Sequence, residues 1–482
     1  MNVLLLAPPW GEIYGRFRSV TRSLNLNPPL NLAYLAAALK DAGHNPFICD
    51  LEFEPRRIDV LKKLIHDHQP DLVGLTVTTP MMPIIVRLAA AIKSLGVPVV
   101  IGGPHVSLVR GEALEQCPQA DFGVLGEAEE NFARIVSALG RGESLEGLSG
   151  ALLREVPDNG ATLPLAPDLD ALPEPYYPGI DFRNYPWSVK GKGQVPTRTI
   201  MTSRGCPFQC VFCGIENLTG RGVRFRTEAM VVDEMERAVR ESPVRHFVFV
   251  DDLLTLRRKR IMALCEELAK RDLPITWEGD TRADSVDEEL LSAMSRAGCT
   301  RVNFGIESGD QEILDGLRKK LKLPKVVEAF RMAKKFGLDT RGTAMIGNPG
   351  DTRETIDATI RFMGGLKNLD QPYLSIAQPY PGTELRRIAL SGESNLRVVD
   401  GQLDRMRRYG GAVMYVGDIS PEELVKLQRR ALLRMYLRPR RIWYNLMRSS
   451  LRSGVSMAIA FAAGVLLPAP NYQKDESVID FA

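Results

Sequence analysis

Three cysteines stand close together near the middle of the chain, at Cys206, Cys210 and Cys213. Cysteine thiolates are the ligands that hold iron–sulfur clusters in proteins. Three thiolates in so short a stretch can bind three irons of a [4Fe–4S] cube, which leaves the fourth iron open to a ligand that is not protein. The spacing Cys-x3-Cys-x2-Cys therefore predicts a metal centre in which these residues are both metal ligands and catalytic residues.

Zinc and a disulfide are the alternative uses of such cysteines. A structural zinc site needs four protein ligands. The remaining cysteines are scattered, at Cys49, Cys117, Cys265 and Cys299, and no histidine lies near the three. A disulfide would leave one of the three unpaired. The spacing thus favours an iron–sulfur cluster over both alternatives.

The motif extends to an aromatic residue, Phe212, directly before the last cysteine and to Gly214 directly after it. With these neighbours the stretch 204–214 closely resembles the signature of the radical S-adenosylmethionine (radical SAM) family. The resemblance implies that the amino and carboxylate groups of SAM bind the open iron. It also implies that one electron cleaves SAM into methionine and a 5′-deoxyadenosyl radical, which removes a hydrogen atom from substrate, and that Phe212 and Gly214 help to bind the cofactors.

Composition is ordinary for a globular protein with full hydrophobic cores. The 482 residues suffice for two or three domains, and a net charge of +3 gives no argument for nucleic-acid binding. The seven cysteines do not form a secreted disulfide pattern, so we expect a reduced, cytoplasmic compartment. Met1–Ala7 lacks the basic leader of a signal peptide, and no stretch reaches the roughly 20 apolar residues that span a bilayer.

Short apolar runs alternate with helical patterns over residues 1–140, which predicts an α/β domain with a doubly wound, Rossmann-like parallel sheet. Strands are expected at 3–7, 46–49, 72–77, 97–101 and 122–125, and helices at 30–42, 60–67, 82–95 and 128–139. Ligands of such sheets bind beyond the carboxyl ends of the strands. The candidate binding residues at these ends are Thr76, Gly102, Gly103, His105 and Glu127.

The order of segments in this domain resembles the cobalamin-binding domains that precede the barrel in one large radical SAM subgroup. The matching stretches are Pro29–Ala36, Val73–Thr76, Gly102–His105 and Gly126–Glu129. The Asp-x-His-x-x-Gly motif, whose histidine ligates cobalt in domains of the methionine synthase type, does not occur. The resemblance therefore implies cobalamin without a histidine ligand, and the alternative is a domain that binds no cobalamin. We expect His105 in a loop, where it contacts the polar tail of the cofactor or merely supports the loop.

A proline-rich stretch at residues 141–195 is predicted to be a linker, and strands and helices alternate again over residues 196–390. Strands are expected at 198–202, 247–250, 275–278, 302–306, 343–346 and 374–377. Six strand–helix units fit the partial (β/α)6 barrel of the TIM type that the radical SAM resemblance implies. The first strand ends just before Cys206, so the cysteines lie at the carboxyl end of the barrel, where chemistry collects in such folds.

Charged residues follow the second and third barrel strands. Asp251 and Asp252 end the second strand, and either carboxylate can accept hydrogen bonds from the SAM ammonium, with a cap for the next helix as the alternative. Arg282 follows the third strand. Its planar guanidinium suits the SAM carboxylate, and a surface salt bridge is the competing assignment.

The remaining strand ends match the family in their order. Glu307 and Ser308 end the fourth strand, where the resemblance implies contacts to the ribose hydroxyls or amino group of SAM; the alternative is structural capping. Gly347 follows the fifth strand and would let the backbone lie against adenine. Gln378 follows the sixth strand. Apart from the resemblance, the glycines and prolines near these two residues indicate only turns.

Residues 391–482 are predicted to form a small helical region rich in arginine, with an apolar run at 457–467. Basic residues followed by apolar ones suit a helix that lies on an anionic membrane surface. That assignment would place the protein peripherally on the inner face of the membrane. The alternative is a helix packed on the barrel with its arginines in solvent.

Together the two resemblances imply a cobalamin-dependent radical SAM enzyme that methylates an unactivated carbon of a small or lipid-like metabolite. They imply a [4Fe–4S] cluster, SAM and cobalamin as cofactors, and an external one-electron donor of the flavodoxin or ferredoxin type. Two alternatives stay open. One is a radical reaction without methyl transfer, as in anaerobic magnesium-protoporphyrin ester cyclases or hopanoid modification, and the other is a non-catalytic cobalamin or iron–sulfur sensor.

Overall fold

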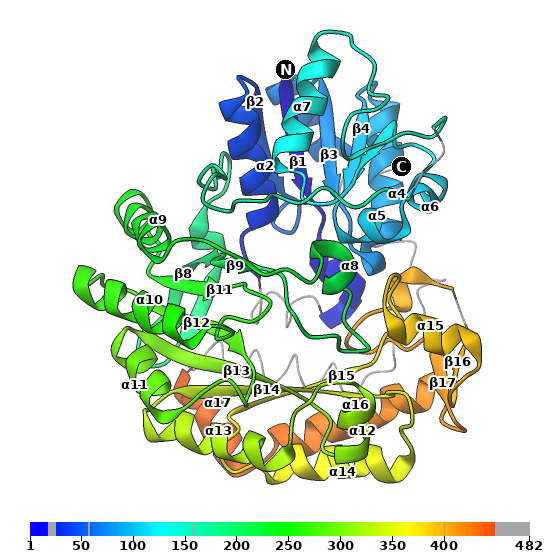
Figure 1. Ribbon diagram of the computed structural model, residues 1–482. Coiled ribbons are helices and arrows are strands. Elements are labelled where there is room, and N and C mark those ends of the chain that lie inside the picture. Colours follow the sequence, from blue (N-terminus) through cyan, green and yellow to red (C-terminus); the bar gives the residue numbers. More distant parts are fainter. Residues whose placement is uncertain (18–25, 56–57, 157, 159, 400, 449–482) are drawn as a thin grey trace.

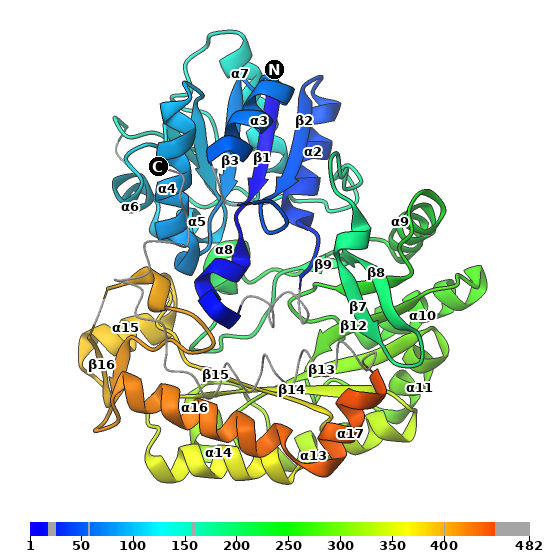
Figure 2. The same ribbon diagram turned by 180° about the vertical axis from the view of Figure 1, so that it is seen from behind.

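The computed structural model describes residues 1–17, 26–55, 58–156, 158, 160–399 and 401–448. It contains one large sheet in the amino-terminal part of the chain and another in the part that follows (Figure 1). Seen from behind, the first sheet stands above the open side of the second, which curls around that side (Figure 2).

The first sheet has six strands in the order β2-β1-β3-β4-β5-β6. They are β1 (Asn2–Ala7), β2 (Asn45–Asp50), β3 (Leu72–Thr76), β4 (Val99–Gly102), β5 (Phe122–Val124) and β6 (Ala151–Leu152). Neighbouring strands are parallel except β6, which pairs antiparallel with β5 at the edge. Their apolar runs are nearly continuous because both faces of the sheet are buried.

Helices cover both faces of this sheet, which confirms the doubly wound architecture. The pair α2 (Leu30–Asp41) and α7 (Glu129–Gly140) packs on one face, and α3 (Ile58–His68) and α4 (Met82–Ser94) pack on the other. Two further helices follow β4, α5 (Pro104–Val109) and α6 (Gly111–Gln116), and the sequence analysis missed both. Each has barely more than one turn, too short to show a helical period. The expectation of a loop at His105 is wrong, since this residue lies in α5.

The second sheet has seven strands in the order β15-β14-β13-β12-β11-β8-β7. They are β7 (Pro186–Val189), β8 (Gly193–Ile200), β11 (His246–Phe249), β12 (Thr276–Thr281), β13 (Cys299–Glu307), β14 (Asp339–Ile346) and β15 (Gln371–Ile376). The strands from β8 to β15 are parallel, which confirms the predicted partial barrel. β7 pairs antiparallel with β8 at the edge.

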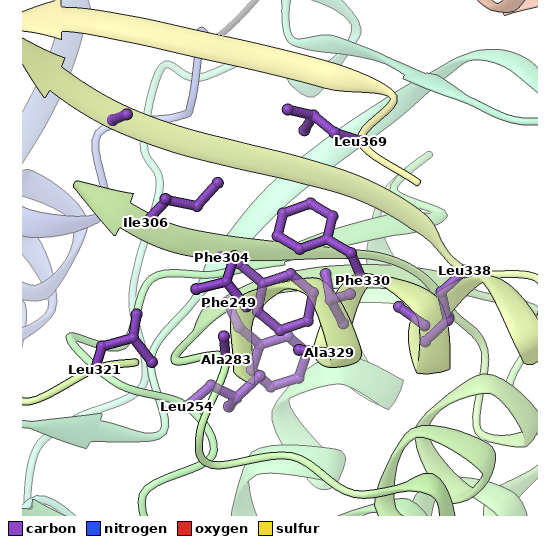
Figure 3. Packing of buried hydrophobic residues seen from close by; sticks show 14 of the residues in the cluster. Phe249, Leu254, Ala283, Phe304, Ile306, Leu321, Ala329, Phe330, Leu338 and Leu369 are labelled. Atoms are coloured by element: carbon purple, nitrogen blue, oxygen red, sulfur yellow. The ribbon is translucent and has the colours of Figure 1, made fainter. Parts of the chain in front are cut away.

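Helices cover the convex face of the curled sheet (Figure 1). They are α9 (Glu228–Glu241), α10 (Arg258–Arg271), α11 (Glu288–Arg296), α12 (Gln311–Gly316), α13 (Leu323–Lys335) and α14 (Arg353–Gly365). Figure 3 shows Phe304 of the sheet and Phe330 of α13 within the buried core between these layers. Helix α9 was not predicted, because its few buried apolar residues lie among many charged ones.

Side chains of the curled sheet alternate between the helix-covered face and the concave face. On β12, Trp277 is fully buried, and a Cβ at Gly279 would stand 2.6 Å from the Leu254 side chain, so both residues face the helices. Glu278 and Asp280 therefore point to the concave side. This alternation decides which strand residues can reach a ligand held inside the curl.

Two parts of the chain without a clear sequence pattern have regular structure. β6 and β7 both come from the predicted linker, which thus supplies an edge strand to each large sheet. After α15 (Glu384–Ser391), a two-stranded sheet of β16 (Leu396–Val398) and β17 (Met414–Val416) precedes α16 (Pro421–Tyr436) and α17 (Pro439–Arg448).

The described C-terminal helices pack on the barrel, as one of the two alternatives expected, but not all of their arginines are in solvent. Arg441 is buried and donates to the carbonyl of Met363, and Arg438 donates to the carbonyl of Gly364. Both arginines thereby satisfy carbonyl groups at the end of α14. The apolar run at 457–467 lies outside the described residues. Among those described, no helix has the length and apolar character needed to cross a bilayer.

Candidate active site

The three cysteines lie in the cluster loop, residues 205–214, at the carboxyl end of the curled sheet. Beside this loop the chain forms a short antiparallel ribbon of β9 (Ser203–Arg204) and β10 (Arg224–Phe225). Gly205 has a φ of 99°, and a Cβ there would stand 2.4 Å from the carbonyl oxygen of Gly222. Glycine is required at this turn, so the ribbon fixes the start of the cluster loop.

The middle of the cluster loop is held by Val211, whose side chain is buried in the barrel core. Its N–H donates to the carbonyl of Leu317 at 3.1 Å, and its carbonyl accepts from the N–H of Leu385 at 2.8 Å. The N–H of Cys213 donates to the carbonyl of Cys210 at 3.0 Å, which closes a turn between two of the cysteines. All three cysteines remain partly exposed and free of disulfides.

The structure separates two acidic residues that the sequence could not. Asp251 is buried and accepts hydrogen bonds from the hydroxyls of Thr202 at 2.7 Å and Ser203 at 2.5 Å, so it braces the end of β8. Asp252 is exposed and accepts from the N–H of Gly205 at 2.9 Å. The next helix, α10, begins well after both, so the capping alternative is wrong. Asp252 is the carboxylate available to a ligand beside the cluster loop.

Two cations lie against the cluster loop. The Arg282 guanidinium stacks 4.0 Å from the centre of the Phe208 ring and donates to Asp284 and to the carbonyl of Lys319. Lys319 is buried and donates to Glu307 Oε1 at 2.9 Å. Burial opposes its charge, but Glu307 holds the pKa of Lys319 above its ordinary value. Lys319 was not predicted as a site residue, because only the fold brings the segment after α12 back to this strand end.

Glu307 reaches this place through an irregularity in β13. It has a φ of 69°, and the pairing with β14 shifts register between Gly305 and Glu307. A Cβ at Gly305 would stand 2.5 Å from Glu307 Oε1, so the carboxylate folds back over the glycine. Ser308 is fully buried instead, and its hydroxyl pairs with that of Thr359 on α14 at 3.1 Å. These contacts favour the structural alternative for Ser308.

The thiols stand where burial disfavours the thiolate and neighbouring cations favour it. Burial raises the pKa of Cys213 to about 11. It also raises the pKa of Cys206 and of Cys210, against the opposing charges of Lys319 and Arg282. Iron ligation requires thiolates, so binding releases these protons and the two cations stabilise the charge that results.

The donor set suits a cluster better than a single metal ion. Within the described ranges, no three or more His, Cys, Asp or Glu side chains converge on one metal position. A cube needs no such convergence, because each cysteine binds a different iron. The role of the three cysteines as ligands stays a prediction that this arrangement fits.

Two other predicted binding residues contact the C-terminal region. Gln378 is buried and donates to the carbonyls of Arg407 and Gly411, both at 2.9 Å. Gly347 has a φ of 86°, and a Cβ there would lie 3.5 Å from the side chain of Leu424 on α16. Both residues are at the strand ends expected for them, while their contact with SAM stays a prediction.

The carboxyl edge of the first sheet brings three of the candidate cobalamin contacts together. Thr76 of β3 and Gly102 of β4 are partners in the sheet register, and Gly103 follows with a φ of 104°. A Cβ at Gly103 would lie 3.0 Å from the backbone nitrogen and oxygen of Val77. Glycine therefore permits a tight turn at the strand ends, where sheets of this type accept a ligand.

His105 points into its own domain. Its side chain is fully buried, with Nδ1 3.1 Å from the hydroxyl of Thr79 and Nε2 2.8 Å from the amide oxygen of Gln116. Burial lowers the pKa of His105, which favours the neutral ring. Both ring nitrogens of His105 are occupied by these contacts, and cobalamin without a histidine ligand stays a prediction. The contacts favour a supporting role over contact with the cofactor.

Glu127 joins the two domains through a buried ion-pair cluster. Its carboxylate lies 2.5 Å from Arg224 Nη2 and 3.0 Å from Arg204 Nη1, and it accepts from the N–H of Ala166 at 2.8 Å. Arg204 also pairs with Glu129 at 2.5 Å. Burial alone would raise the pKa of Glu127, but the two arginines hold it below its ordinary value. The carboxylate predicted to bind cofactor therefore ties the first sheet to the ribbon beside the cluster loop.

A second contact joins the domains at the other end of the cluster loop. A Cβ at Gly214 would lie 3.8 Å from Leu108 of α5, and a Cβ at Gly382 would lie 2.6 Å from the same side chain. The helix that follows the cluster loop, α8 (Ile215–Thr219), also contacts α5. Since α5 begins directly after Gly103, the cluster loop and the ligand edge of the first sheet adjoin.

Known proteins share both parts of this architecture. The Radical SAM superfamily model matches residues 200–363, and the B12 binding domain model matches residues 20–136. The uncharacterized methyltransferase PH0819 of Pyrococcus horikoshii is 34% identical over 446 residues, which are 91% of this chain and 93% of that protein. The anaerobic magnesium-protoporphyrin IX monomethyl ester cyclase of Rubrivivax gelatinosus is 29% identical over 370 residues, or 74% of this chain and 65% of the cyclase.

A solved structure extends the likeness to the whole fold. The radical S-adenosylmethionine methyltransferase TsrM of Kitasatospora setae, with cobalamin and a [4Fe–4S] cluster bound, has a TM-score of 0.70 at 19% identity. The alignment covers 96% of this chain and 99% of that chain.

The cofactors of this architecture are a [4Fe–4S] cluster, SAM and cobalamin, and its chemistry requires a reductant and a small-molecule substrate. The cysteine-bearing loop and the glycine-lined sheet edge fit the cluster and cobalamin respectively. Two matched domains in one chain, with a relative of comparable length, show the family. The chain belongs to the cobalamin-dependent radical SAM enzymes.

Proposed function

We propose that this enzyme transfers a methyl group to an unactivated carbon of a small organic substrate held between the two sheets. The observation that carries the proposal is a pair of contacts between the two domains, one on each side of the cluster loop. Glu127 makes ion pairs on one side, and Leu108 packs against glycines on the other. When bound, the cluster with SAM supplies a hydrogen-abstracting radical and cobalamin supplies the methyl group. Both must reach one carbon, and the fixed contact between the two binding edges meets that requirement.

The residues of this chain bind and orient the cofactors and shield the reaction. We assign cluster ligation to the three cysteines and charge balance to Arg282 and Lys319. Asp252 and Glu307 are the carboxylates placed to accept hydrogen bonds from SAM. The tight edge at Thr76, Gly102 and Gly103 is assigned to cobalamin.

The names of the relatives support methyl transfer and also define the second candidate. PH0819 and TsrM are both described as methyltransferases. The Rubrivivax relative is a cyclase, at lower identity and over less of the chain. A radical reaction that changes bonds without transferring a methyl group is therefore the second candidate, and a non-catalytic sensor is the third.

Product analysis of the anaerobically reconstituted enzyme separates these candidates. Methyl transfer yields both 5′-deoxyadenosine and S-adenosylhomocysteine, a cyclase-type reaction yields only the first, and a sensor yields neither. Alanine at Cys206, Cys210 and Cys213 together is expected to remove iron and abolish both products. Cys265→Ala, a change in the buried core outside the cluster loop, is the matched control and should keep its iron. Deoxyadenosine without S-adenosylhomocysteine in the presence of substrate would refute methyl transfer.

We further propose a cytoplasmic location and a flavodoxin or ferredoxin as electron donor. The seven unpaired cysteines support a reducing compartment. Peripheral membrane contact rests on residues 457–467, which are not described. Sedimentation with phosphatidylglycerol vesicles, comparing the full chain with a chain that ends at residue 448, tests that contact.

A further inference from the structure

A row of polar side chains crosses the concave face of the barrel sheet. The strand register pairs Asp280 of β12 with Asn303 of β13, and Asn303 with Arg341 of β14. All three belong to the alternation that faces away from the helices. The Asn303 amide donates to Asp280 Oδ1 at 2.8 Å, which fixes the orientation of both groups. The row lies just inside the strand ends that carry Arg282 and Glu307.

Two oxygens in this row, Asn303 Oδ1 and Asp280 Oδ2, accept no hydrogen bond from the described residues. Asn303 is 6% exposed, and its Oδ1 accepts no hydrogen bond from any described residue. Asp280 is exposed, and within the described chain only Oδ1 of its carboxylate accepts a hydrogen bond. A buried acceptor without a donor is unfavourable, and few such groups persist in folded proteins. Two adjacent acceptors suit a ligand that brings an ammonium or hydroxyl group.

A further cation, Arg408, lies at the carboxyl end of β15, on the same sheet as the row. The Arg408 side chain is exposed and makes no ion pair or hydrogen bond with the part of the chain described. Its charge acts on the carboxyl of Asp280. The backbone is fixed, because the Arg408 carbonyl accepts from the N–H of Ile376 at 3.2 Å and from the amide of Gln428 at 2.8 Å. The backbone is thus fixed while the planar guanidinium stays available, and such a group suits an anion.

Few large apolar side chains are exposed near the row. Among the large hydrophobic residues of the described barrel strands and their ends, only Val250 is exposed, at 42%. The half-buried aromatic residues beside Arg341 are tyrosines, since its guanidinium lies 5.0 Å from the ring centre of Tyr373, which contacts Tyr409. An extended hydrocarbon ligand would need a broad apolar lining. The lining here combines charge, hydrogen-bonding groups and tyrosine rings.

We propose that Asp280, Asn303 and Arg408 recognise the substrate, and that the substrate is a small polar molecule carrying an anionic group together with an ammonium or hydroxyl group. Arg408 binds the anion, and the oxygens of Asp280 and Asn303 accept hydrogen bonds from the donor. This assignment rests on the proposed function. It narrows the expected substrate from a small or lipid-like metabolite to a small polar one. A hydrocarbon such as a hopanoid would desolvate these groups and leave them unpaired.

Stimulation of SAM cleavage by fractionated cell extract tests the substrate class. The full-length holoenzyme is incubated with SAM, reductant and one of three fractions from the organism that makes it. These are aqueous solutes retained on an anion exchanger, aqueous solutes that pass through it, and organic-solvent lipids dispersed as vesicles. We expect an aqueous fraction to raise deoxyadenosine formation above the rate without extract. The retained fraction does so if the donor is a hydroxyl, and the unretained fraction does so if the donor is an ammonium, which cancels the charge of the anion. Stimulation by the lipid fraction alone, or by none, overturns the proposal. Stimulated deoxyadenosine without S-adenosylhomocysteine refutes methyl transfer but leaves the substrate class standing.

Substitutions test whether Asp280 and Arg408 are responsible for the stimulated deoxyadenosine formation. Asp280→Asn and Arg408→Gln are each expected to lower the stimulated rate about tenfold or more, as the loss of a hydrogen bond to a charged group predicts. Arg408→Lys keeps the charge without the planar geometry and should recover part of the response. The matched controls are Asp357→Asn on α14 and Arg430→Gln on α16, both at exposed positions. Iron content and the urea midpoint report folding, and a full response in both variants would overturn the assignment.

Discussion

Replacing Gly205 by alanine is expected to displace the start of the cluster loop. The backbone has a φ of 99° there, a conformation that costs a residue with a Cβ about 1–3 kcal/mol. The added carbon would also stand 2.4 Å from the Gly222 carbonyl oxygen, and relief of that overlap costs a further ~1–3 kcal/mol. The sum, about 2–6 kcal/mol, is a large part of the ~5–15 kcal/mol that stabilises a typical domain.

The chain relieves this strain at less cost by moving the loop than by unfolding. A shift at Gly205 loosens the hydrogen bond from its N–H to Asp252, now 2.9 Å long, and carries Cys206 with it. We therefore expect a folded protein that retains little iron after anaerobic reconstitution. Iron per chain, the visible absorption of the cluster and the urea midpoint are the measurements.

Gly222→Ala is the matched control, because it changes the same ribbon without a clash. A Cβ at Gly222 meets nothing within 4 Å. We expect this variant to stay within about 1 kcal/mol of the wild type and to keep its iron. The reasoning is refuted if Gly205→Ala holds as much iron as the wild type at an unchanged midpoint. Equal losses in both variants would show that the ribbon tolerates no added carbon anywhere.

Three further predictions concern charged side chains. The Asp280 side chain is open to the concave space, but the protein packed around it replaces bulk water and raises its pKa. Its contribution to stability is therefore present below about pH 4 and is lost as the pH rises through the raised value. Asp280→Asn should therefore raise the urea midpoint at pH 7 but not near pH 4, and a lower midpoint at pH 7 would contradict this. Arg301→Met leaves the Glu278 carboxylate, now 2.7 Å from that arginine, without its main partner. The expected loss is about 3–5 kcal/mol in urea unfolding, and a loss within the error of the midpoint would count against a structural role. Lys319→Met should make the reduction potential of the cluster more negative than in the exposed control Lys320→Met, as measured by a redox titration followed by electron paramagnetic resonance. Equal potentials in the two variants would show that the buried cation does not act on the cluster.

The parallel strands could be predicted from the sequence, because a strand that is buried on both faces has a continuous apolar run. It also placed the cysteines correctly at the end of the first barrel strand. The edge strands β6 and β7 escaped prediction, since each is short and lies within the proline-rich segment. Antiparallel pairing at an edge depends on tertiary contact rather than on a local pattern.

The site was predictable where strand ends alone decide position. Parallel strands end on one side of a sheet, which is why Asp252, Arg282 and Glu307 meet the cluster loop as expected. Lys319 was not predictable, because its place depends on a bulge in β13 and on a chain reversal after α12. Glu127 matched a family motif, yet two arginines from the other domain occupy its carboxylate.

The polar row on the concave face did carry a sequence signal. Glu278 and Asp280 are acidic residues at alternate positions of β12, and Arg301 and Asn303 alternate in the same way on β13, although the predicted strands left out Asp280 and Arg301. Alternating charge in a barrel strand indicates side chains that point inward. The register that pairs Asp280 with Asn303 could not be derived without the structure.

The backbone of Arg408, whose side chain is assigned to the substrate, is held by a helix that follows the barrel strands. The amide of Gln428 on α16 donates to the carbonyls of Leu374 at 2.9 Å and Arg408 at 2.8 Å, and its oxygen accepts from the N–H of Gly410 at 3.0 Å. One of the three proposed substrate contacts thus depends on a helix that follows the catalytic strands in the chain. Changes in α16 can alter that contact while the strands that carry Asp280 and Asn303 stay untouched.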